Sequence, residues 1–317
     1  MRSFHATCCA TLLAAFGSAE AGAATPADYV ADFQRARAQD QATTTVDIDN
    51  DTLLLNHHDG FYTSGLRLTR EFALDRAASD RGQAFSYGWR IGQELYTASD
   101  IKLQPDRIVA RDHPYAGWLY AGVFRQTSEA DGSSLRYGID VGCLGSCALG
   151  RETQKTLHRF THQPPPQGWS SEVRREVGVV LHADAVPFCL RLGRSVDLTP
   201  GLQGRVGNIY TDLAGRLVLR FGMLQPDPSA AAWQGYTRVQ ARAVAYNASL
   251  QGGYFSTDNP RVVDPKRLVG EVEIGVRYMT GRYTWSAAIV RAGNEIAPLS
   301  NAIGTRNFGR LQLAIAP

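Results

Sequence analysis

LVGEVEIGVRY, residues 268–278, alternates apolar side chains with glycine and charged side chains. Apolar residues occupy the even positions from Val272 to Tyr278, and Glu271, Glu273 and Arg277 occupy odd positions. A period of two places the two sets on opposite faces of a β-strand. The alternation recurs in residues 87–92, 135–143, 216–223 and 282–289, so the chain is predicted to be all-β.

Two all-β architectures fit this pattern. A soluble periplasmic sandwich would bury the apolar face and expose the polar one. A transmembrane antiparallel β-barrel is favoured because the polar face carries charges of both signs, as a packed polar lumen does. The apolar face also often begins or ends in an aromatic residue, as interfacial girdles would. About 10 residues per strand plus loops allows roughly 10 to 14 strands.

The N-terminus has the features of an export signal. Arg2 and His5 precede an apolar run at residues 10–16, and Ala21-Gly22-Ala23 supplies the small residues of a cleavage site. We therefore expect a signal peptide at residues 1–23 and an exported β-barrel domain at residues 24–317. No later apolar stretch reaches about 18 residues, so no transmembrane helix is expected. The formal net charge of +3 gives no indication of nucleic-acid binding.

Two of the cysteines that remain after cleavage lie close together. Cys143 and Cys147 flank Leu144-Gly145-Ser146. On one extended strand they would be too far apart to bond, whereas a turn between them would allow a disulfide. The sequence leaves both possibilities open.

Two segments interrupt the strand pattern. Residues 150–162 are polar and place Gln154, His158 and His162 four residues apart, which would align them on one face of a helix. The three prolines at 164–166 end any such helix. Residues 103–112 form the second interruption, a charged loop that contains Arg107 and Arg111.

An acid-amide pair marks a candidate metal site. Asn50 and Asp51 follow Asp47 and Asp49, and oxygen side chains of this kind bind hard cations such as Ca²⁺. A solvated strand end or turn has the same composition. Strand parity separates Asn50 from Asp51, so both reach one site only if the strand ends or bulges there. Parity also places Thr63 on the inner face, where a threonine usually has a structural role.

His158 is the candidate general base. A neutral imidazole can take a proton from water near pH 7, and Gln154, one helical turn earlier, can orient a polar ligand beside it. The alternative is a surface helix that carries a histidine by chance. No Gly-x-Ser-x-Gly motif is present to nominate a serine nucleophile.

Seven short motifs then occur in a characteristic order. They are Asn50-Asp51-Thr52-Leu53, Tyr62-Thr63-Ser64-Gly65, Gln93-Glu94-Leu95-Tyr96-Thr97-Ala98-Ser99-Asp100, Asp112-His113-Pro114-Tyr115-Ala116-Gly117-Trp118-Leu119-Tyr120, Gln154 with His158-Arg159, Pro166-Gln167-Gly168-Trp169, and Gly207-Asn208. Each is weak alone, but the ordered set resembles the outer-membrane lipid A 3'-O-deacylase family over nearly all the mature chain.

The resemblance implies a barrel of twelve strands in the outer membrane that hydrolyses the ester of the 3'-linked acyloxyacyl group of lipid A. It implies a Ca²⁺-dependent site at the outer-leaflet end, with lipopolysaccharide as the substrate. His158 would be the base that activates water, and Asp51 and Asn50 would hold Ca²⁺ or shape the oxyanion site. Thr63 would line that site, Gln154 would assist, and Trp169 would support the loop.

The substrate's glucosamine phosphates require cationic partners, and we expect these from the loop after residue 100. Lys102, Arg107 and Arg111 are the candidates, because ammonium and guanidinium groups bind phosphate.

Three features depart from the family pattern. The family commonly has arginine at the position of His113, the Cys143–Cys147 pair is not a family feature, and the chain ends at Pro317 instead of an aromatic residue. A barrel without catalysis, such as a narrow pore or a structural protein, is the alternative function, and it would need neither His158 nor Asp51. The oligomeric state is left open.

Overall fold

The computed structural model describes residues 26–54, 60–74, 83–224 and 230–317, and the predicted signal peptide lies outside these ranges. The strands are β1 (Ala42–Asn50), β2 (Phe61–Leu74), β3 (Ala84–Thr97), β4 (Ala116–Ser128), β5 (Ser134–Leu144), β6 (Glu176–Val186), β7 (Leu190–Arg191), β8 (Val196–Gly207), β9 (Tyr210–Gly222), β10 (Ala232–Asn247), β11 (Leu268–Thr280), β12 (Tyr283–Ala292) and β13 (Arg306–Ile315). The helices are α2 (Pro26–Gln39), α3 (Gly150–Thr161), α4 (Ala248–Gln251) and α5 (Asn301–Gly304), with 3-10 turns η1 (Asp51–Leu54), η2 (Gly145–Ala148) and η3 (Gly168–Ser171). Within the described ranges, no helix has the length and apolar character needed to cross a bilayer.

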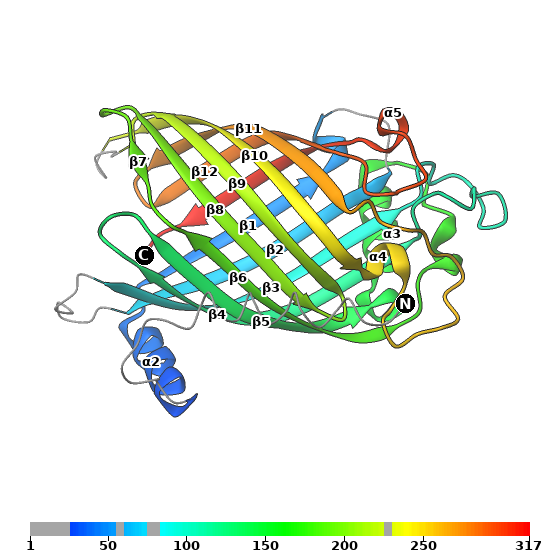
Figure 1. Ribbon diagram of the computed structural model, residues 1–317, viewed down its shortest axis with the longest axis horizontal. Helices are drawn as coiled ribbons and strands as arrows, with labels where there is room; N and C mark the ends of the chain where they lie inside the picture. The colour runs from blue at the N-terminus through cyan, green and yellow to red at the C-terminus, as the bar shows by residue number, and fades with distance from the viewer. Residues whose placement is uncertain (1–25, 55–59, 75–82, 225–229) are drawn as a thin grey trace.

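Twelve of the described strands form a closed antiparallel barrel (Figure 1). Sequential neighbours pair from β1 to β6 and from β8 to β13. Pairing of β1 with β13 and of β6 with β8 closes the ring. The two-residue strand β7 pairs with β8 beside the ring. The predicted transmembrane β-barrel of twelve strands is therefore confirmed.

The two faces of the wall carry the residues predicted for them. On β11, Val272 and Ile274 are 41% and 61% exposed on the outside, whereas Glu271 and Glu273 line the lumen. The soluble alternative requires the opposite arrangement, with apolar side chains inside, so it is wrong for this chain.

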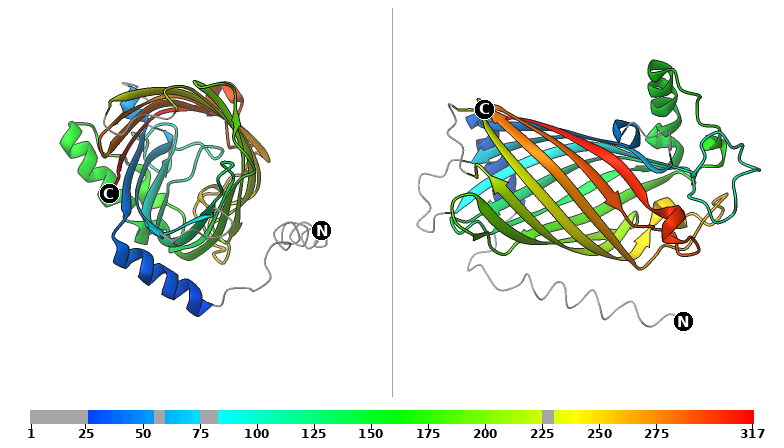
Figure 2. Two further views of the ribbon diagram at one scale, coloured as in Figure 1. Left: turned by 90° about the vertical axis from the view of Figure 1, so that its left-hand side faces the viewer. Right: turned by 90° about the horizontal axis from the view of Figure 1, so that it is seen from above.

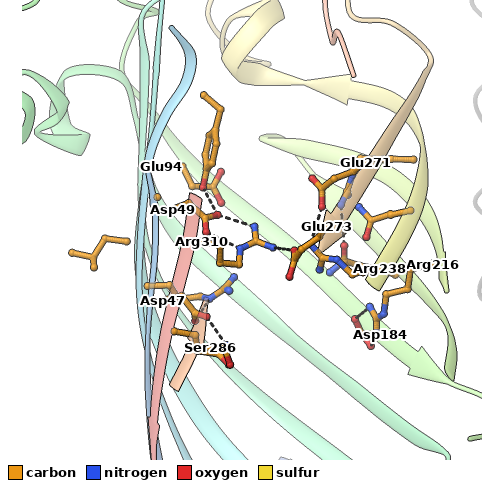
Figure 3. Close-up of a pocket in the computed structure, with 18 of the residues that line it drawn as sticks. Asp47, Asp49, Glu94, Asp184, Arg216, Arg238, Glu271, Glu273, Ser286 and Arg310 are labelled. Atoms are coloured by element: carbon orange, nitrogen blue, oxygen red, sulfur yellow. Dashed lines mark hydrogen bonds and ion pairs between the residues drawn. The ribbon is translucent and has the colours of Figure 1, made fainter. Parts of the chain in front are cut away.

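The lumen is crossed by ion pairs between strands (Figure 3). Arg310 on β13 donates from Nε to Asp49 on β1 at 2.7 Å and from Nη1 to Glu273 on β11 at 2.5 Å. Arg238 on β10 donates from Nη2 to both Glu271 and Glu273, at 2.7 and 2.5 Å. These pairs surround a cavity of about 410 Å³. Charges that would be costly alone therefore satisfy one another inside the barrel.

The two ends of the barrel differ in their connections (Figures 1 and 2). One end carries α3, α4 and α5 and the long loops 98–115, 145–175 and 248–267. At the other end, residues 129–133 and 281–282 join hairpins, and α2 packs through the ring of Phe33, 6.0 Å from that of Phe72. Outer-membrane barrels have short periplasmic turns and longer extracellular loops. The end with α3 is therefore the extracellular end.

Candidate active site

The acid-amide pair lies where β1 ends. Asn50 is the last residue of β1 and has the outward parity of Ile48, and Asp51 begins the 3-10 turn η1. The Asn50 side-chain oxygen accepts hydrogen bonds from the backbone N–H of Thr52, at 2.8 Å, and from the Thr52 hydroxyl. This local turn redirects the chain, so both Asn50 and Asp51 reach one cleft. Of the two alternatives that the sequence leaves open, an end of the strand or a bulge, the structure has the end of the strand at this pair.

Thr63 does not face the lumen, and the parity prediction for it was wrong. The register of β2 against β3 shifts between Tyr62 and Ser64, which makes Thr63 the extra residue of a β-bulge. The bulge turns Tyr62 inward, where its hydroxyl donates to Asp49 at 3.1 Å. Thr63 lines the cleft on the other side of the wall, and its hydroxyl lies 2.8 Å from that of Thr97.

The predicted helix is α3, and it lies outside the barrel wall near the end of β1 (Figure 2). Gln154 and His158 are its buried polar residues, 1% and 3% exposed. His162 does not join them, because α3 ends at Thr161 and His162 has a left-handed φ of 56°. A β-carbon at Gly150 would lie 2.3 Å from the ring of Trp169, so glycine permits this close approach.

These segments enclose one cleft between the outer face of the wall and α3. It is lined by Asn50, Asp51, Thr52, Thr63, Ser64, Leu95, Thr153, Gln154, Leu157, His158, Thr161 and Gln163. Five of the predicted site residues therefore converge, although they come from β1, η1, β2 and α3. The free space is about 20 Å³, which is enough for one water molecule.

His158 is held by a backbone carbonyl. Its Nδ1 lies 2.7 Å from the carbonyl oxygen of Pro164, which can only accept, so Nδ1 carries the proton. The lone pair of the neutral ring is then on Nε2. The proline segment that ends α3 thus also fixes the tautomer of the candidate base.

Gln154 is oriented by Trp169. The indole Nε1–H donates to the Gln154 side-chain oxygen at 2.7 Å, and both side chains are buried. Because the indole can only donate, the oxygen of the amide must face Trp169. The amide Nε2 is buried and has no hydrogen-bond acceptor within the described residues. Gln154 therefore presents an N–H donor to the cleft.

The oxygen atoms on the wall side suit a hard cation. Asp51 supplies a carboxylate, 3% exposed, whose Oδ2 also accepts from the Gly60 N–H at 3.3 Å. Asn50 and Thr63 add an amide oxygen and a hydroxyl. Oxygen ligands of mixed charge fit Ca²⁺. No group of three His, Cys, Asp or Glu side chains is arranged to hold a metal in the described residues, so neutral oxygens would complete any coordination.

The three predicted phosphate ligands do not reach the cleft. Lys102, Arg107 and Arg111 are exposed in the loop between β3 and β4, and none of them lines the cleft. The loop contacts the segment after α3, where the N–H of Gln167 donates to the Ile101 carbonyl at 2.8 Å. The loop is thus at the extracellular end of the barrel, but its three cationic side chains do not line the cleft that holds the candidate base.

His113 is structural. Its ring stacks on Tyr96, with centroids 5.2 Å apart, and Nδ1 lies 2.6 Å from the Pro114 carbonyl oxygen. Burial lowers the pKa of His113 to about 4, so the ring is neutral at physiological pH. His113 therefore occupies a buried packing position outside the cleft.

A disulfide joins Cys143 to Cys147, with the Cα atoms 5.9 Å apart. Cys143 is near the end of β5, and Cys147 lies in η2, so the chain makes the turn that bonding requires. The Gln93 side chain donates to the Ala148 carbonyl at 2.6 Å and to the Thr153 hydroxyl at 3.1 Å. These links fasten the start of α3 to the wall.

Sequence reasoning missed several residues that line the cleft. Leu157 and Thr161 share a helix flank with Gln154 and His158, so helical periodicity could have identified them. Ser64 and Leu95 have no comparable signal, because only the pairing of β2 with β3 brings them together.

Comparisons with known proteins agree with this architecture. The model of the family described as "Outer membrane protein LpxR" matches residues 7–316. Among solved structures, LpxR from Salmonella typhimurium aligns with a TM-score of 0.71 at 18% identity, covering 87% of this chain and 100% of that chain. The translocator domain of the autotransporter NalP from Neisseria meningitidis aligns with a TM-score of 0.47 at 9% identity, covering 92% and 95%. No curated protein sequence matches. The chain belongs to the LpxR family of outer membrane proteins, and it is a β-barrel of the Gram-negative outer membrane.

Proposed function

We propose that this protein is a lipid A deacylase, which hydrolyses the ester of the 3'-linked acyloxyacyl group with lipopolysaccharide as its substrate. Family membership supports the class of reaction. The observation that carries the proposal is the convergence of His158, Gln154 and the Asn50–Asp51 pair in one cleft. The cleft is on the outside of the wall at the extracellular end, where lipid A of the outer leaflet is accessible.

The base in this proposal is Nε2 of His158. It accepts a proton from a water molecule as that water attacks the ester carbonyl, and the imidazolium returns the proton to the departing sugar oxygen as the ester C–O bond breaks. General acid–base catalysis of this kind contributes typically 10²- to 10⁴-fold to a rate. The Nδ1–H bond to the Pro164 carbonyl keeps the ring in the required tautomer and stabilises the imidazolium that forms. A serine nucleophile is therefore not needed.

Negative charge develops on the carbonyl oxygen during this attack, and Gln154 can stabilise it. Its Nε2 is a buried N–H donor without an acceptor in the described residues, and Trp169 holds it in position. A donor fixed before the reaction stabilises an oxyanion without reorganisation of the site.

Ca²⁺ is the proposed cofactor. Asp51, Asn50 and Thr63 would hold it, and a cation bound there supplies positive charge that polarises a carbonyl oxygen. These side chains are already held by the η1 turn and the bulge, so the oxygens need little rearrangement. Recognition of the glucosamine phosphates by Lys102, Arg107 and Arg111 stays a prediction.

Mass spectrometry of lipid A tests the function. Cells that make the protein, grown with calcium, should yield lipid A that has lost the mass of one acyloxyacyl group, whereas cells without it should not. A folded barrel that leaves the lipid A mass unchanged would contradict the proposal and support a non-catalytic pore or structural protein. Heat-modifiable gel mobility shows that the barrel has folded.

A further inference from the structure

The exposed surface of α3 has two chemically distinct flanks. Successive residues of a helix are rotated by roughly 100°, so residues three or four apart share a side. Leu157 and Phe160 lie on one side of the buried His158, and Phe160 is 79% exposed. Arg151, Lys155 and Arg159 follow at intervals of four on the other side. Within the described residues, Lys155 and Arg159 form no ion pair.

Contacts of α3 fix the direction of each flank. On the side of Leu157 and Phe160, the Thr153 hydroxyl accepts a hydrogen bond from Gln93 of β3. On the cationic side, Arg151 donates from Nη2 to the Trp169 carbonyl at 3.0 Å, in the loop after the helix. The apolar flank therefore faces the outer surface of the barrel wall at β3, and the cationic flank faces the extracellular loops.

The apolar flank is continuous with the membrane-facing surface of the barrel. Ile91 lies two residues before Gln93 on the same outward face of β3, and it is 48% exposed. On β1, the exposed Ile48 is two residues from Asn50 of the cleft on the outward face. On β2, the exposed Leu66 is likewise two residues from Ser64 of the cleft. Along all three strands an exposed apolar residue is thus followed, at the level of α3, by a polar one.

We propose that α3 lies at the boundary between acyl chains and headgroups of the outer leaflet. Leu157 and Phe160 insert among the acyl chains, and Lys155 and Arg159 bind lipid phosphates, as in amphipathic interfacial helices. The helix then holds the cleft at the depth where ester bonds join acyl chains to the headgroup. This deepens the proposed function by naming how the lipid reaches the cleft.

Spin labels test the depth of α3 without any assay of activity. The full barrel with Cys189→Ser would carry a nitroxide at one new cysteine and be placed in vesicles of phosphatidylethanolamine and phosphatidylglycerol. At Leu157→Cys and Phe160→Cys, we expect oxygen to relax the label more than a water-soluble nickel chelate does, as at Leu66→Cys on the lipid-facing wall. At Lys155→Cys, which is exposed on the cationic flank of α3, we expect the reverse. Equal nickel accessibility at positions 155 and 160 would place α3 in water and overturn the insertion, whether or not the protein is a deacylase.

A matched pair of lipids tests the cationic flank. The double variant Lys155→Gln/Arg159→Gln should lose about tenfold in kcat/KM on bis-phosphorylated lipid A, since a charge-assisted hydrogen bond is worth about one factor of ten or more. On dephosphorylated lipid A the double variant and the wild type should react alike. Equal losses on both lipids would overturn the phosphate assignment.

Discussion

The lumen and the cleft are both lined by polar residues, yet they differ in how those residues are bonded. In the lumen, charged side chains of neighbouring strands neutralise one another, as Arg310 does with Asp49 and Glu273. In the cleft, a turn holds Asn50 and the indole of Trp169 holds Gln154, each from one side. The lumen network therefore stabilises the wall, whereas the cleft keeps an N–H donor available for a ligand.

Removing a charge from the lumen should have the largest effect on stability and little effect on activity. Arg310→Met leaves Asp49 and Glu273 without their shared partner and should lower the free energy of unfolding by about 3 kcal/mol. Thermal unfolding measured by heat-modifiable mobility checks this, with the exposed Arg282→Met as a control. A variant that loses deacylation while its stability is unchanged would contradict the division between lumen and cleft.

Removing the carboxylate of the cleft should lower the activity strongly and leave the stability almost unchanged. Asp51→Asn should reduce the rate of acyl release at least about 100-fold and raise the calcium concentration needed for half-maximal activity, with a normal thermal transition. Calcium titration after chelation measures both quantities. The exposed Asp258→Asn, on the 248–267 loop, is the control. An unchanged calcium requirement in Asp51→Asn would remove Asp51 from the proposed cation site.

Trp169 should act by positioning Gln154. Trp169→Phe keeps an aromatic ring against Gly150 but removes the N–H that fixes the amide. We expect kcat to fall about tenfold with KM nearly unchanged, which corresponds to the loss of one hydrogen bond in the transition state. Trp233→Phe, on the exposed outer face of β10, is the matched control. A rise in KM without a change in kcat would indicate a role in substrate binding instead.

A carboxyl beside the cleft should make the local packing sensitive to pH. Burial raises the pKa of Glu172 from 4.5 to about 7, Glu152 adds to the rise, and Arg151 opposes it. Because the pKa is raised in the folded state, the neutral carboxyl stabilises the folded state fully below about pH 4.5. This stabilisation is lost as the pH rises through about 7. The protection of the amides of residues 167–175 against hydrogen exchange, taken relative to their intrinsic exchange rates at each pH, should therefore fall between about pH 4.5 and 7. Glu172→Gln should abolish that change, and an identical pH dependence in the variant would exclude Glu172 as its cause.

Strand alternation predicted the barrel and both of its faces, because every second residue of each strand faces either lipid or paired charges. The spacing of four between Gln154 and His158 likewise predicted α3. The prediction from alternation was wrong for Thr63. One extra residue in a bulge reverses which face the side chains before it occupy, and the sequence pattern does not show where that residue is inserted.

The rest of the site depends on contacts between segments that are far apart in the sequence. The position of α3 outside the wall follows from Gly150 against Trp169 and from the bonds of Gln93. Neither is visible in a local pattern. Exposed loops have no period, so charge alone nominates Lys102, Arg107 and Arg111, and none of the three lines the cleft.

The most direct measurement of the central claim compares two histidines of the same segment. His158 is buried in the cleft, and His162 is exposed just beyond the end of α3. In cells that make His158→Ala, lipid A should retain its full acyl mass although the barrel folds, while His162→Asn, which suits the left-handed φ, should deacylate like the wild type. Deacylation by His158→Ala at the wild-type level would contradict the claim that this cleft is the catalytic centre.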